Sequence, residues 1–237
     1  MIPISYLLEH SGLPGPRGNL SLLYEFASTA DEAAVQECLG FLRDDLSNSP
    51  QEFVAVCGIV GFCTLHKKTV PATIGAVRPH AVHASWRVRE AVAMGIQELA
   101  EHHVGEVIDA LEPWITGGPL EQRAVVAALC EPKLLKVPGE VQRVLEVLGR
   151  ITNEFLPIEG KLSDDKVSLR QTLGYGWSVA MAALPSAGKL AFEALPWGHR
   201  HVGWIVRENL KKNRLKLMDE PWVDTMLRRP SQVRPSL

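Results

Sequence analysis

The densest group of charged side chains in this 237-residue sequence lies near its C-terminal end. Five cations fall between positions 207 and 216, namely Arg207, Lys211, Lys212, Arg214 and Lys216. Because a helix turns by about 100° per residue, Arg207, Lys211 and Arg214 are predicted to share one helix face. Lys212 and Lys216 are predicted to lie on an adjacent stripe. Such a face suits contact with the phosphates of a nucleic acid. The same residues can also be a solvated helix end, where cations favour the negative end of the helix dipole.

The distribution of charge supports a localised anionic partner. The whole chain has a formal net charge of −2, which argues against a protein that binds nucleic acid over its entire surface. Residues 199–237, however, carry nine Lys or Arg and four Asp or Glu, a net charge of +5, whereas residues 1–198 carry −7. An anionic partner is therefore expected at the C-terminal end.

No catalytic group can be assigned from the sequence, so the catalytic residue is unknown and the chain is expected not to be an enzyme. The candidate tryptophan–carboxylate pairs are Trp114 with Asp109 or Glu112, and Trp222 with Asp224. Trp222 and Asp224 are two residues apart and point to different sides of a helix, and Glu112 and Trp114 have the same spacing.

Metal, hydrolase and phosphate-loop patterns are also missing. The histidine pairs are His80 with His83, His102 with His103, and His199 with His201. None has the spacing of His-Glu-x-x-His, and no Gly-x-Ser-x-Gly occurs, so we expect no metal and no cofactor.

Small and aromatic residues have a structural explanation. Gly174-Tyr175-Gly176 lacks a preceding strand, so its glycines are expected to permit close packing of helices rather than to bind phosphate. Trp86, Trp177 and Trp204 are expected to pack in the core or between repeats.

The four cysteines indicate a reducing compartment. Each lies in an apolar, helix-like stretch and none forms a Cys-x-x-Cys pair, so buried free thiols are predicted. They are Cys38, Cys57, Cys63 and Cys130. The N-terminus does not resemble a signal peptide, and no window of about 18 apolar residues predicts a membrane span. A cytoplasmic location without membrane contact is therefore expected.

The elements that must position these residues are predicted to be helices. Asn19, Asp31 and Ser85 are candidate N-caps, and Asp164 or Asp165 is a fourth. The stretch 53–65 is apolar nearly all round and is predicted to be a central, buried helix. Only 52–57 and 69–71 have strand-like character. The predicted helices cover 20–26, 31–42, 53–65, 86–103, 104–115, 120–129, 138–155, 165–181, 185–195, 199–218 and 220–229.

An internal repeat favours stacked helix pairs. The hexapeptide at 86–91, Trp-Arg-Val-Arg-Glu-Ala, recurs at 204–209 as Trp-Ile-Val-Arg-Glu-Asn, with weaker copies at 121–124 and 168–171. The arginines are spaced by 34, 47 and 37 residues, a mean step of about 39, which is typical of two-helix repeats. They are Arg89, Arg123, Arg170 and Arg207.

The Val-Arg pairs within these copies resemble the motif of the HEAT-repeat (armadillo-like) superfamily of α-solenoids. They are Val88-Arg89 and Val206-Arg207, with Leu169-Arg170 as a conservative variant. The resemblance implies an all-α fold, a right-handed superhelical α-solenoid of about five to six HEAT-like helix pairs. It also implies that the valines face the core, that the arginines bond neighbouring repeats, and that a concave face meets long partners. The stretch 204–215 is similar to the terminal helices of bacterial HEAT-like proteins in the wider group that includes the DNA alkylation repair glycosylases.

These observations predict one domain and lead to three hypotheses about function. Residues 1–18 form a lead segment and loop, 19–229 a single repeat domain, and 230–237 a flexible tail. The leading hypothesis is a non-catalytic scaffold that binds a macromolecular, anionic partner, protein or nucleic acid, on its concave face. The alternatives are a DNA-binding protein of the alkylation repair glycosylase type and a peptide or protein adaptor.

Overall fold

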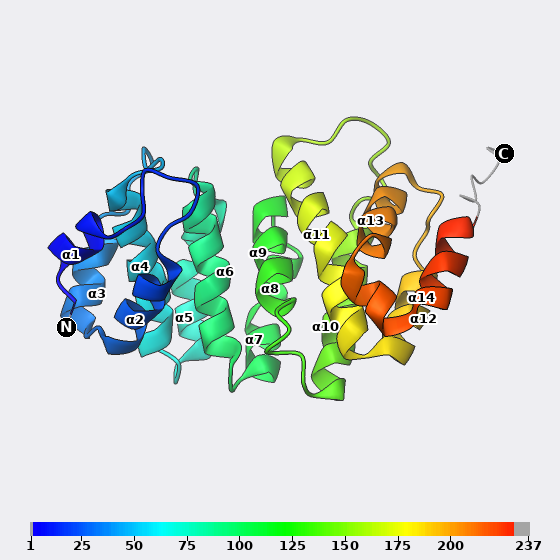
Figure 1. Cartoon of the computed structure of the whole chain (residues 1–237), viewed down its shortest axis with the longest axis horizontal. Helices are drawn as coiled ribbons and strands as arrows, with labels where there is room; N and C mark the ends of the chain where they lie inside the picture. The colour runs from blue at the N-terminus through cyan, green and yellow to red at the C-terminus, as the bar shows by residue number, and fades with distance from the viewer. Residues whose placement is uncertain (1, 230–237) are drawn as a thin grey trace. The chain divides into compact units, whose positions relative to one another are not determined.

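The structure, a computed structural model, describes residues 2–229, so the tail predicted at 230–237 lies outside the described residues. Within that range the chain forms fourteen α-helices and one 3₁₀-helix without any strand, which confirms the all-α prediction (Figure 1). None of these helices combines the length and the apolar character needed to cross a membrane. The described chain divides after Leu111 into two compact units, and each is described by itself. The single domain over 19–229 stays a prediction.

The first unit is organised around one buried helix, α4 (Pro50–Leu65). Eleven of its sixteen residues are buried, and α1, α2, α3 and α6 pack against it (Figure 1). A helix that is apolar on all sides has no solvent face to present, so this central position is the predicted one. The other elements are α1 (Ile4–Glu9), α2 (Leu20–Thr29), α3 (Glu32–Leu39), α5 (Val70–Val77), η1 (Arg78–Val82), α6 (Trp86–Ala100) and α7 (Val104–Ala110).

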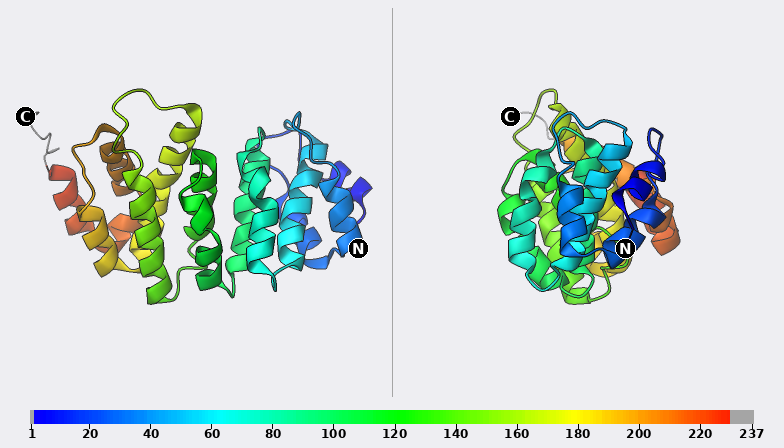
Figure 2. Two further views of the ribbon diagram at one scale, coloured as in Figure 1. Left: turned by 180° about the vertical axis from the view of Figure 1, so that it is seen from behind. Right: turned by 90° about the vertical axis from the view of Figure 1, so that its left-hand side faces the viewer.

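The second unit is organised around α11 (Asp164–Ala183), the longest helix. Helices α9, α10, α12, α13 and α14 all pack against it, as the two views in Figures 1 and 2 show. A β-carbon on Gly176 would lie 2.8 Å from Val126 Cγ1, and one on Gly174 would lie 3.0 Å from Trp204 Cζ3. The glycines therefore permit close helix packing, as predicted. The other elements are α8 (Glu112–Ile115), α9 (Pro119–Leu129), α10 (Pro138–Asn153), α12 (Pro185–Glu193), α13 (Arg200–Leu210) and α14 (Asn213–Arg228).

Within the described residues, side-chain N-caps mark the starts of five helices, which are α2, α3, α4, α6 and α11. The predicted caps Asn19, Asp31 and Ser85 accept hydrogen bonds from backbone N–H groups of the first helical turns. Ser163, rather than Asp164 or Asp165, caps α11, and α4 begins at Pro50 behind the cap Ser49. Residues 69–71 belong to the start of α5 and residues 52–57 to α4, so neither segment is a strand.

Two predicted long helices are each broken. The segment 104–115 forms α7 and α8, with Leu111 as the fully buried C-cap between them. The segment 199–218 is divided between α13 and α14, and α14 is kinked at Asp219, two residues before Pro221. A new helical run after this kink agrees with the predicted restart at Pro221.

The cysteine thiols are inert by position. All four are buried and free, as predicted. Burial raises the pKa of Cys38, Cys63 and Cys130 to about 12, and it raises the pKa of Cys57 well above its ordinary value. Thiols that hold their protons so firmly are poor nucleophiles and poor metal ligands.

Candidate anion-binding face

The five cations predicted to lie on one helix are divided between two helices and the junction that joins them. Helix α13 ends at Leu210, Lys211 is its C-cap, and Lys212 is the extended residue before α14. The reason is the phase of the apolar residues. On a straight continuation of α13, Leu215 would fall about 60° from Arg200, on the solvent side. The break turns the chain so that Leu215 is fully buried.

The solvent side of α13 carries a narrow row of cations. Arg200, Trp204, Arg207 and Lys211 lie within about 60° of one another around the helix axis, since they are spaced by four, three and four residues. Arg200, Arg207 and Lys211 are exposed and Trp204 is half-buried. We call these four residues the α13 stripe.

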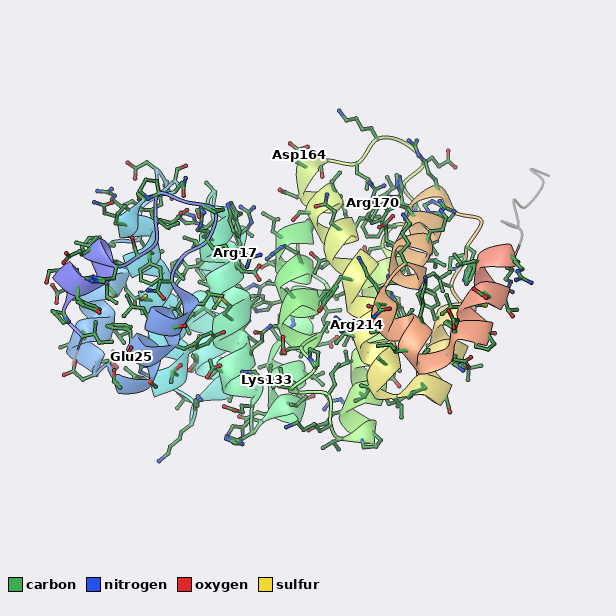
Figure 3. All side chains as sticks on the ribbon, viewed as in Figure 1. Arg17, Glu25, Lys133, Asp164, Arg170 and Arg214 are labelled. Atoms are coloured by element: carbon green, nitrogen blue, oxygen red, sulfur yellow. The ribbon has the colours of Figure 1, made fainter. Side chains whose placement is uncertain are left out.

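Helix α11 adds a further guanidinium to this surface. Arg170 lies with its guanidinium carbon 4.4 Å from the centre of the Trp204 ring, and its Nη1 is 3.2 Å from Nδ1 of His201. Figure 3 labels Arg170 where α11 and α13 run side by side. Arg170 therefore bridges α11 and α13, and its predicted role between neighbouring repeats stays a prediction.

The proton position on His201 follows from its two neighbours. Its Nε2 lies 3.0 Å from the carbonyl oxygen of Gly160 and must donate to it, so Nδ1 accepts from Arg170. Burial lowers the pKa of His201, and the nearby Arg170, His199 and Arg200 lower it further. The ring is therefore neutral at physiological pH, which lets it serve as an acceptor for the arginine.

The guanidinium groups of this face have no carboxylate partner among the residues that the structure describes. Burial lowers the pKa of Arg170, and repulsion by Arg200 adds to this effect, so the two guanidinium groups lie within each other's field. The side chains of Arg200 and Arg207 form no ion pair or hydrogen bond with any residue that the structure describes. The uncapped first turn of α13, where His199 offers no side-chain acceptor, adds its own positive potential. This arrangement can bind an anion without first breaking an existing ion pair.

The remaining predicted cations are placed differently. Lys211 Nζ lies 2.5 Å from Glu208 Oε1, so part of its charge is compensated. Arg214 donates to the Tyr175 hydroxyl at 2.7 Å and lies over that ring, which holds it against α11 (Figure 3). Lys212 is half-buried at the start of α14 and Lys216 is exposed on that helix.

The other repeat positions follow the expected pattern in part. Val88 and Val206 are fully buried, as the repeat motif implies. Arg89 donates to the carbonyl oxygens of His83 and Ala84, in the segment that leads into its own helix. Arg123 is half-buried on α9.

Trp114 and Trp222, the two tryptophans of the candidate pairs, each have a structural role. Trp114 is buried, while Glu112 forms a two-pronged ion pair with Arg150. The Trp222 indole donates to Glu193, and Asp224 is exposed. Glu112 is therefore committed to Arg150 rather than to Trp114, and the Trp222 indole N–H is committed to Glu193 rather than to Asp224.

His83, one member of the predicted histidine pairs, binds backbone groups through both ring nitrogens. His83 accepts from the backbone N–H of Ser85 and its other ring nitrogen lies 3.2 Å from the Arg43 carbonyl oxygen. Among the residues that the structure describes, no group of three His, Cys, Asp or Glu side chains is arranged to hold a metal ion.

Arg200 and Trp204 contribute to the face although the sequence does not predict them there. Arg200 lies seven residues before Arg207, a spacing that indicates a shared helix face, but it lies outside the dense cluster at 207–216. Trp204, which is predicted to pack in the core or between repeats, is half-buried between α13 and α11, beneath Arg170. The same prediction is correct for Trp177, which is buried and donates to Thr152, and wrong for Trp86, which is 53% exposed at the first position of α6.

Comparison of the chain with protein-family models, with curated proteins and with solved structures finds no match in any of the three.

Proposed function

We propose that this protein is a non-catalytic helical scaffold that binds a nucleic-acid strand through the α13 stripe and Arg170. The observation that carries the proposal is the uncompensated charge of Arg170, Arg200 and Arg207 around one half-buried indole. Guanidinium groups bind phosphate with two parallel hydrogen bonds. The Trp204 indole lies beneath Arg170 and holds that guanidinium on this face. Planar guanidinium groups can also stack on bases, which an acidic protein surface does not offer.

We further propose that the helices form HEAT-like pairs stacked into a right-handed solenoid of about five to six pairs. The support is the recurrence of the hexapeptide of 86–91 at 204–209, together with the burial of Val88 and Val206 at equivalent positions. One helix pair cannot bury its apolar face alone, so stacked neighbours supply the core. Such a stack would present the α13 stripe as part of an extended binding surface.

The test is binding of a fluorescein-labelled, single-stranded DNA oligonucleotide of mixed sequence, followed by fluorescence anisotropy at several salt concentrations. With three phosphate contacts, the logarithm of affinity should fall with the logarithm of salt at a slope of about −2, or about 20-fold between 50 and 200 mM. Arg200→Glu and Arg207→Glu should each weaken binding by about tenfold and make the slope less steep.

Three matched variants sharpen the result. Lys136→Glu changes an exposed lysine elsewhere in the same unit and should leave affinity unchanged. Lys216→Glu tests the one-helix interpretation of the cluster and should weaken binding far less than Arg200→Glu. Trp204→Leu keeps the charges but removes the ring that holds Arg170 in place, so it should reduce affinity by less than Arg200→Glu does. If the oligonucleotide does not bind at low salt, or if poly-glutamate binds more tightly, the proposal is wrong.

A further inference from the structure

The first unit contains a pocket that the basic face does not explain. It has a volume of about 290 Å³ and lies between the loop that precedes α2, helix α2 itself, α4 and the start of α6. Its floor is apolar and buried, with Leu13, Leu23 and Phe53. Its rim holds two large apolar side chains in water, Leu20 and Trp86, each 53% exposed.

The pocket wall is held in place by a buried ion pair. Glu52, which is 1% exposed, binds Arg87 Nη1 at 3.2 Å through Oε2 and accepts from the Ser85 hydroxyl through Oε1. Arg87 Nη2 also donates to the carbonyl oxygen of Gly15 at 2.8 Å. These bonds join the loop to α4 and α6, so the pocket exists before any ligand arrives.

The mouth of the pocket carries one uncompensated cation. Arg17 lines the pocket, is exposed, and forms no ion pair or hydrogen bond with the residues that the structure describes; Figure 3 labels it. The charge of Arg87 is matched by Glu52. Glu90, the carboxylate in the wall, has an interaction partner of its own. An apolar floor with a free arginine at its edge is complementary to an apolar group next to a carboxylate.

We propose that this pocket docks a short segment of a partner protein, with one large apolar side chain in the pocket and an acidic residue beside it against Arg17. Size and exposure favour a peptide over a small molecule. A volume of about 290 Å³ is at the lower end of the range for small-molecule sites, near 300–1,000 Å³. A ligand confined to it would leave the rim side chains of Leu20 and Trp86 in water, whereas a peptide backbone lying across the mouth covers both. Exposed tryptophans beside a pocket are typical centres of such interfaces.

The proposal is independent of nucleic-acid binding, because no residue of the pocket belongs to the α13 stripe or its helix. Either activity can fail without affecting the other.

The test is selection of a random peptide library, displayed on phage, against the full chain. The expected consensus has one Leu, Phe or Trp with Asp or Glu within a few residues. A synthetic peptide of this consensus is then titrated by anisotropy. Trp86→Ser should weaken binding by about 30-fold and Arg17→Glu by about fivefold. Replacing the peptide's apolar anchor by alanine should abolish binding.

Two control variants exclude general surface effects. Leu190→Ser removes an apolar side chain that is 76% exposed in the second unit, and Lys136→Glu removes an exposed lysine there, so both should bind the peptide as the parent does. Selection of no peptide, selection of basic peptides, or binding that is insensitive to Trp86→Ser would overturn the proposal. Binding of indole-3-acetate at this pocket without any peptide binder would also overturn it.

Discussion

The buried ion pair between Glu52 and Arg87 offers the sharpest test of the first unit. The side chains are 2% and 13% exposed, and each has further hydrogen bonds, to Ser85 and Gly15 respectively. Arg87→Met keeps most of the aliphatic volume but leaves the Glu52 carboxylate buried without its counter-charge. Removing one partner of a buried pair typically costs about 3–5 kcal/mol. We expect a loss of this size in the stability of the first unit.

Hydrogen exchange followed by mass spectrometry measures this loss where it occurs. Protection of backbone amides in α4 should fall by about two to four orders of magnitude in Arg87→Met, because each 1.4 kcal/mol is a factor of about ten. Amides of α11, at the centre of the second unit, should keep their protection. The matched control is Arg150→Met, which breaks an ion pair with Glu112 in which both side chains are about half exposed. Such a pair contributes at most about 1 kcal/mol.

A double variant separates the cost of the orphaned carboxylate from the cost of lost packing. Glu52→Gln combined with Arg87→Met leaves no unpaired charge in the core, so it should be more stable than Arg87→Met alone. A double variant at least as unstable as the single one would show that the loss comes from packing rather than from the orphaned carboxylate. Equal protection of α4 in Arg87→Met and in the parent would refute the reasoning altogether.

Two further predictions concern the second unit. Gly176→Ala should destabilise it by about 1–3 kcal/mol in urea unfolding, because the added carbon would lie 2.8 Å from Val126 Cγ1. Gly149→Ala, on the open side of α10 with nothing within 4 Å, should instead stabilise it by about 0.5–1 kcal/mol, and the opposite ranking would contradict the packing. The pKa of His201 is lowered on folding, so the imidazole binds a proton more readily in the unfolded chain than in the folded one. The free energy of unfolding should therefore fall as the pH drops below about 6.5, the pKa of histidine in an unfolded chain. The loss should be at most about 1.4 kcal/mol per pH unit. Urea unfolding at pH 7.5 and 5 should show this loss, and His201→Gln should reduce it.

Local signals made much of the fold predictable from the sequence. Side chains at Asn19, Asp31 and Ser85 cap helices because their oxygens reach N–H groups only two or three residues away. The all-round apolar character of residues 53–65 can be satisfied only by burial on every side, and α4 is buried on every side. Such inferences need no knowledge of which helices pack together.

The candidate site was less predictable because its determinants are distant in sequence. The stacking of Arg170 on Trp204 joins residues 34 positions apart on two helices, and nothing in either segment specifies that contact. The break after Leu210 did have a signal: the position of Leu215 is out of phase with the apolar face of α13. The cations at 211–216 nevertheless favoured the prediction of one straight helix, because charged side chains are readily accommodated on an exposed helix.

The recurring hexapeptide shows how one motif produces two different surfaces. Trp86 is the first residue of α6, whereas Trp204 is the fifth residue of α13, so α13 begins one turn earlier relative to the motif. The valine two residues after each tryptophan is buried in both helices, which fixes the same face toward the core. The extra turn of α13 supplies Arg200 and His201, and His201 holds Arg170 over the indole of Trp204.

Without such a turn, the first indole lies at the start of its helix, where it is 53% exposed and forms the rim of the apolar pocket. Both indoles lie beneath a guanidinium, since Arg87 is 4.6 Å from the centre of the Trp86 ring and Arg170 is 4.4 Å from that of Trp204. The position of the helix start relative to the motif therefore changes the exposure of the indole rather than the presence of an arginine over it. The greater exposure of Trp86 is the physical basis for proposing an apolar peptide anchor beside it, whereas the nucleic-acid proposal rests on the unpaired guanidinium groups around Trp204.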